Sequence, residues 1–123
     1  SGKSNLDTFT AQLGIIGQKN NIEFVSIIPK NVINSIDNSA TQNTEENKSL
    51  VDPFLVEGTK KYLIEFNFKT NFVNLLSFLR ELEFQENIIL IDDIDVKSDN
   101  KKIDPNKGSI LRIKLLMTIY GKL

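Results

Sequence analysis

The chain has 123 residues, 40% of them hydrophobic, which is enough for one domain with a real core and too few for two. Its 15 basic and 16 acidic residues give a formal net charge of -1, which argues against a general phosphate-binding surface. The sequence has neither Cys nor His, so disulfides, thiolate metal sites and catalysis by a triad or a thiol are excluded. No apolar run approaches the roughly 20 residues that a membrane helix needs.

The start of the chain, Ser1-Gly2, is typical of the remnant that cleavage of a purification tag leaves. We expect residues 1–3 to be this remnant and a disordered start, and residues 4–123 to be a single domain cut from a longer protein. A long polar loop is expected at about residues 31–58, because the stretch from Asn34 to Ser49 can bury little surface. Apolar residues around Pro53 are expected to anchor its far end: Val51, Phe54, Leu55 and Val56.

The first two predicted elements are a helix over residues 6–19 and a strand over residues 22–28. Proline cannot donate to a sheet ladder, so we expect Pro29 to end that strand. Gly14 and Gly17 weaken the helix by roughly 1 kcal/mol each relative to Ala. Its apolar residues recur at spacings of three and four, which places them on one face: Leu6, Phe9, Leu13 and Ile16.

The second strand is the clearest element of the chain, because apolar and polar residues alternate along it. Tyr62, Ile64, Phe66 and Phe68 are predicted to face the core. Thr70 or Asn71 can cap the helix that follows, which is expected to run to about Gln85. The predicted apolar stripe of this helix consists of Phe72, Leu75, Leu76, Leu79 and Leu82, widened by Val73 and Phe78.

The last two predicted strands cover residues 88–97 and 110–120, with a polar turn region between Asp99 and Gly108. One side of the final strand is predicted to carry Leu111, Ile113, Leu115, Met117 and Ile119. The resulting order, α-β-β-α-β-β, predicts an α+β fold. It is the ferredoxin-like arrangement with a cyclically shifted order: a four-stranded antiparallel sheet with two helices on one face.

The sequence resembles the periplasmic domain of PilO-type proteins, which assemble type IV pili at the inner membrane; the GspM-like proteins of type II secretion are relatives. Residues 62–120 carry the resemblance, chiefly the alternating strand at 62–66, the helix at 78–83 and the segment at 88–96. It implies a non-enzymatic structural component of the assembly platform, a periplasmic dimerisation module of a bacterial inner-membrane protein. Thr70 and Asn71 stand where the family usually has Gly, and Asn87 stands where it often has Arg.

The partners implied by the resemblance are a second copy or a PilN-like protein, and a PilP-like lipoprotein. Contact with the membrane is expected only through an anchor outside this chain. No nucleic acid, cofactor or catalytic residue is expected. The alternative function is a ligand-sensing or RNA-binding ferredoxin-like domain, although the aromatic signature of RNA-binding sheets is missing.

Three neighbouring carboxylates could suggest a site for a hard cation, because calcium prefers several carboxylate oxygens. On a regular strand, however, Asp93 and Asp95 share one face while Asp92 points to the other. The spacing also lacks the Gly turn and the closing Glu of a calcium loop. The sequence therefore predicts a solvated strand end and no metal site.

The informative feature is an excess of apolar residues on the second face of the sheet. If the helices cover the face that carries Phe66 and Ile113, the other face is left with several large apolar side chains. A contiguous apolar patch of this kind usually marks a partner surface, unless the long loop or a terminus folds over it. The candidate interface residues are Leu63, Ile89, Ile91, Ile110, Leu116 and Tyr120.

Overall fold

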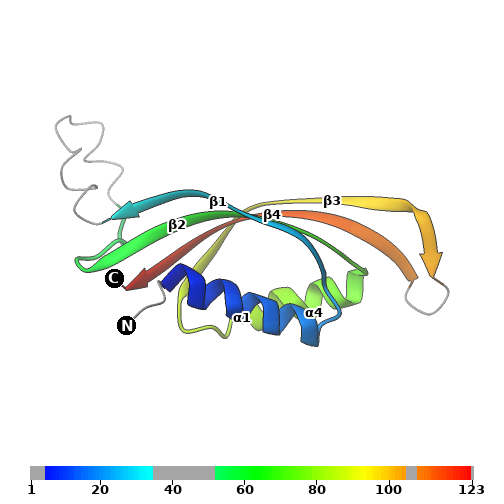
Figure 1. The fold of residues 1–123 in the computed structure, drawn as a ribbon, viewed down its shortest axis with the longest axis horizontal. Coiled ribbons are helices and arrows are strands. Elements are labelled where there is room, and N and C mark those ends of the chain that lie inside the picture. Colours follow the sequence, from blue (N-terminus) through cyan, green and yellow to red (C-terminus); the bar gives the residue numbers. More distant parts are fainter. Residues whose placement is uncertain (1–4, 35–51, 105–107, 123) are drawn as a thin grey trace.

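The computed structural model describes residues 5–34, 52–104 and 108–122, with the predicted order of helices and strands (Figure 1). Helices α1 (Asn5–Lys19) and α4 (Phe72–Leu82) lie on the same face of one sheet. The strands stand in the order β1-β2-β4-β3, and every neighbouring pair is antiparallel. The predicted fold class is thereby confirmed. The strand bounds are β1 Glu23–Asn34, β2 Thr59–Thr70, β3 Ile88–Asp104 and β4 Gly108–Lys122.

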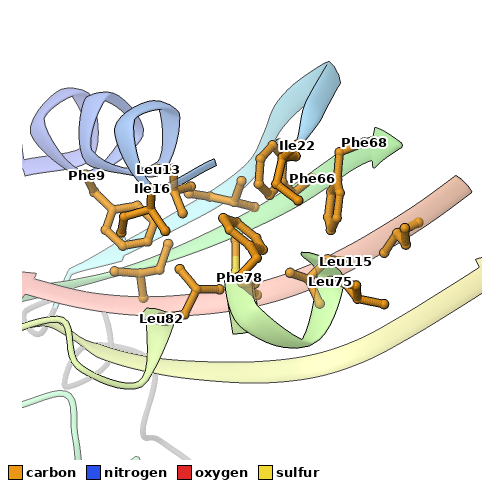
Figure 2. Close-up of a cluster of buried hydrophobic side chains, with 14 of the residues drawn as sticks. Phe9, Leu13, Ile16, Ile22, Phe66, Phe68, Leu75, Phe78, Leu82 and Leu115 are labelled. Atoms are coloured by element: carbon orange, nitrogen blue, oxygen red, sulfur yellow. The ribbon is translucent and has the colours of Figure 1, made fainter. Parts of the chain in front are cut away.

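The core lies between the helices and the two central strands (Figure 2). The predicted alternation is confirmed, because every second residue from Tyr62 to Thr70 in β2 and from Ile113 to Ile119 in β4 is buried on the helix side. From α1, the predicted stripe of Phe9, Leu13 and Ile16 packs into the same cluster. The buried strand residues are Tyr62, Ile64, Phe66 and Phe68 from β2 and Ile113, Leu115, Met117 and Ile119 from β4.

Helix α4 begins at the predicted cap: the Asn71 side chain accepts a hydrogen bond from the Asn74 N–H at 2.8 Å. Its buried stripe is narrower than predicted and consists of Leu75, Phe78 and Leu82, with Leu79 partly buried. The inclusion of Phe72, Val73 and Leu76 was wrong, since all three are exposed. A helix resting on a sheet buries only the side chains that point at it, and these three stand on its flank or outer side.

A polar contact between the helices fixes which flank of α4 faces α1. The buried Asn20, just after α1, accepts a hydrogen bond from the Ser77 hydroxyl at 2.6 Å and donates to Glu81 Oε1 at 3.3 Å. Its amide also donates to the Ile16 carbonyl at 2.8 Å, and Lys19 pairs with Glu81 at 3.6 Å. The flank with Ser77 and Glu81 therefore faces α1, and the opposite flank faces away from it.

Strand β1 continues through Pro29 to Asn34, so the prediction that proline ends it was wrong. As the outer strand beside β2, β1 tolerates a residue without a backbone N–H. Its pairing shifts between Phe24 and Ser26 and again between Pro29 and Asn31, so the edge is irregular. Of the predicted loop, residues 31–34 thus belong to β1. Residues 1–3, 35–50 and Val51 lie outside the described residues.

The β3–β4 hairpin is longer than predicted, because β3 runs to Asp104 and β4 begins at Gly108. Much of the segment between Asp99 and Gly108, expected as a polar turn region, is therefore strand. The hairpin extends beyond Thr70, the last residue of β2, which lies opposite Leu111 (Figure 1). Composition suggested a turn because Asp, Asn, Pro and Gly are depleted in strands, but this preference is weak and depends on context.

Candidate protein-interaction surface

The face of the sheet that points away from the helices, here called the open face, carries part of the predicted interface. Leu63 and Leu116 lie on it and are half-buried. Ile110 alternates onto the same face, but it stands on the projecting hairpin past the end of β2. The structure therefore brings Leu63 and Leu116 onto adjacent strands and leaves Ile110 apart from them.

Tyr120 also lies on the open face, but the segment before β2 covers it. The Tyr120 hydroxyl donates to Asp52 Oδ2 at 2.6 Å, and Lys61 Nζ lies 3.0 Å from the same oxygen. The Phe54 ring packs against Tyr120 with a centroid separation of 5.5 Å, and Leu55 is buried nearby in the chain. Tyr120 is only 7% exposed as a result, so this end of the open face is closed by the chain itself.

Charge interactions hold this cover in place. Burial by itself raises the pKa of Asp52, but hydrogen bonds from Tyr120, Lys61 and the Phe54 N–H outweigh it and leave the pKa below its ordinary value. Burial, followed by the hydrogen bond to Asp52, raises the pKa of Tyr120 well above its ordinary value. At neutral pH the Asp52 carboxylate is therefore ionised and the Tyr120 hydroxyl is protonated. Their hydrogen bond favours the arrangement in which the segment before β2 covers Tyr120.

The middle of the open face is polar rather than apolar. Glu65 pairs with Lys30 at 3.3 Å and with Lys114 at 3.6 Å, and it accepts a hydrogen bond from Asn67 at 2.9 Å. These contacts, the Asn67 bond foremost, hold the pKa of Glu65 below its usual value. Such solvated ion pairs contribute little to stability, but they make this region a poor apolar docking surface.

The prediction placed Ile89 and Ile91 on the open face, and the register of β3 shows that it was wrong. Ile89 pairs with Ile119 and Ile91 with Met117, so both lie on the helix side of the sheet. A bulge follows between Ile91 and Asp93. It turns Asp92 to the open face as well, where its carboxylate accepts a hydrogen bond from the Thr118 hydroxyl at 2.6 Å.

An uncovered apolar surface also lies on the helix side, where β3 forms the edge of the sheet. Ile91, Ile94 and Val96 share this side and are between 39% and 46% exposed. Helix α4 rests against β4, and its flank away from α1 presents Phe72 at 60% and Leu76 at 45% exposure. We call these five residues the β3–α4 surface. Sequence reasoning missed four of them, although the alternation of Ile94 and Val96 with charged residues was a usable signal.

Within the described ranges, no three acidic side chains lie close enough together to hold a metal ion. Neither described helix is long and apolar enough to cross a membrane.

The comparison with solved structures returns the fold that the sequence resemblance suggested. The structure of the type 4 fimbrial biogenesis protein PilO from Pseudomonas aeruginosa matches with a TM-score of 0.65 at 12% identity, over 98% of this chain and 72% of that chain. A structure from Akkermansia muciniphila matches with a TM-score of 0.58 at 8% identity, over 91% of this chain and 48% of that chain. At these identities the likeness shows the fold, and it is PilO-like. No known family model and no curated protein sequence matches the chain.

Proposed function

We propose that this domain is a non-enzymatic structural component of a type IV pilus assembly platform. It serves as a periplasmic module that pairs with another domain of the same fold and aligns the inner-membrane complex. The observation that carries the proposal is the β3–α4 surface, an uncovered apolar area on a domain with the fold of PilO. A contiguous exposed apolar area on a small domain is typical of a protein partner.

The physical argument rests on where that area lies. An apolar row beside an unpaired sheet edge offers a partner both backbone hydrogen bonds and desolvation, the latter worth roughly 25 cal/mol per Å². The open face offers less, because Glu65 and its cations occupy its centre and Asp52 closes its end. The proposed partners are a second copy or a PilN-like domain, a PilP-like lipoprotein, and the membrane only through an anchor outside this chain.

The alternative is a ligand-sensing or RNA-binding ferredoxin-like domain, and the described residues do not favour its RNA-binding form. Single-stranded RNA is bound by aromatic rings displayed on the open face of such a sheet. Here Phe66 and Phe68 point to the helices and are buried, and Phe24 stacks on Phe66 at 5.0 Å.

A genetic experiment tests the function. Deleting the gene in its native host should abolish surface pili and pilus-dependent motility, and expressing the intact protein should restore both. Restoration should fail with Leu76→Asp in the β3–α4 surface and succeed with Ile15→Asp, a matched change at an exposed position of α1. Normal piliation in the deletion strain, with loss of protein secretion instead, would overturn the proposal.

A further inference from the structure

We propose that β3 pairs with β3 of a second copy, antiparallel across a two-fold axis at Val96. The two sheets then join into one of eight strands. This inference deepens the proposed function by naming the partner and the contact, and it rests on that function for the role of the pairing.

The two edges of the sheet are not equivalent. The β1 edge is interrupted by Pro29 and by two shifts of pairing, features that protect an edge from further strand pairing. On β3, the segment from Asp93 to Lys97 is regular between the bulge after Ile91 and the irregularity after Ser98. Its backbone bonds to β4 on one side only, so the N–H and C=O groups of the other side are available to a partner strand.

The charges along this segment select the register. In an antiparallel pair centred on Val96, Asp95 of each copy lies opposite Lys97 of the other, which gives two opposite-charge pairs on the open face. Moving the centre to Asp95 would place that carboxylate opposite its own copy. Moving it to Lys97 would place two ammonium groups together. A centre between residues would exchange the two faces of the sheet. Only the centre at Val96 makes this segment complementary to itself.

The same register brings the two Val96 side chains together at the two-fold axis. Val96 lies on the helix side of the sheet, and on the same side Ile94 of each copy lies opposite Ser98 of the other. Three strand spacings separate the two β4 strands by about 14 Å, and the α4 helices beneath them are about 10–12 Å wide. The flanks that carry Phe72 and Leu76 face each other across this joint, and the strand pairing itself covers Val96 and the backbone edge of β3.

Charge reversal provides the first test, on the 123-residue chain in solution. We expect a weak dimer by sedimentation equilibrium, with a dissociation constant on the order of 10⁻⁴ M, since one strand pair and a helix flank make a small interface. Asp95→Lys and Lys97→Glu should each weaken the homodimer by at least about tenfold, because each change places like charges opposite one another. Mixing the two variants should restore dimers, because both cross-strand pairs are then again of opposite charge. A variant that failed to fold could not give this restoration.

Cysteine cross-linking provides the second test, and the chain has no native Cys to interfere. Directly opposite residues in an antiparallel pair have Cα atoms about 4.5–5.5 Å apart, within the range of a disulfide. Val96→Cys should thus oxidise to a covalent dimer. Val25→Cys, at 56% exposure on the other edge strand, should remain monomeric under the same oxidant.

Three results would overturn the inference: a chain that stays monomeric at about 1 mM, a dimer indifferent to both charge reversals, or equal cross-linking through Val25→Cys. Its failure is separable from failure of the proposed function. If the host still needs the gene for pili while the chain shows no β3 pairing, only the inference falls. If Lys97→Glu abolishes pairing and the host makes pili without the gene, only the function falls.

Discussion

The contact between α1 and β1 makes a sharp prediction about two glycines of one helix. A Cβ added at Gly17 would lie 2.1 Å from Cζ and 2.7 Å from Cε2 of the Phe24 ring, whereas a Cβ at Gly14 would meet nothing within 4 Å. The half-buried Phe24 ring stacks on Phe66 at 5.0 Å and 22°. To admit the methyl group, the ring has to move by about 1 Å and give up much of this stacking.

Comparing the energies at each position shows whether the change from Gly to Ala stabilises or destabilises the domain. Gly17→Ala gains about 1 kcal/mol of helix propensity, but it loses about 0.5–1.5 kcal/mol of ring pairing and adds roughly 1–3 kcal/mol of overpacking. We expect a net destabilisation of about 0.5–3.5 kcal/mol, or roughly 2–14 °C in Tm. Gly14→Ala carries only the propensity gain and should stabilise the domain by about 0.5–1 kcal/mol.

Urea and thermal unfolding of the two variants measure these effects, and a double-mutant cycle identifies their cause. In a Phe24→Leu background the ring is gone, so Gly17→Ala should become neutral or stabilising, with a coupling of about 1 kcal/mol or more. The reasoning is refuted if Gly17→Ala stabilises the parent chain as much as Gly14→Ala does, or if the cycle shows no coupling.

Two further predictions concern the polar contacts. Asp52→Asn should destabilise the domain by about 1 kcal/mol at pH 7, because the hydrogen bond from Tyr120 then no longer reaches a carboxylate. Since the folded pKa of Asp52 is lowered, its contribution is present above about pH 4 and is lost as the pH falls through the folded value. Parent and variant should therefore converge in urea titrations at low pH, and a constant gap would contradict this account. Asn20→Ala should lower the free energy of unfolding by about 1–3 kcal/mol, because the hydrogen bonds of Asn20 to Ser77 and Glu81 are then lost. A change below about 0.5 kcal/mol in urea unfolding would show that water replaces the amide.

The sequence by itself determined the elements with a clear period and the face that each presents to the core. Strand β2 alternates strictly, so the burial of Phe66 and Phe68 could be predicted before any fold was known. Helix α1 has its apolar residues on one stripe, and Asn71 has the side chain that a helix start requires. These features are local, since they depend on spacing along the chain and on backbone chemistry.

The tertiary structure decided the remaining features. At those places the sequence has no alternation that distinguishes the two faces of a strand, or the contact joins residues far apart in the chain. Four apolar residues in a row, Ile88 to Ile91, have no alternation, so only pairing with β4 assigned Ile89 and Ile91 to the helix side. Pro29 could remain in a strand only because that strand is an edge. Asp52 covers Tyr120 across 68 positions of sequence, a contact that no spacing rule encodes. The candidate interface moved from the open face to the β3–α4 surface for this reason: exposure depends on what lies on top of a residue, and that is set by the packing of distant segments.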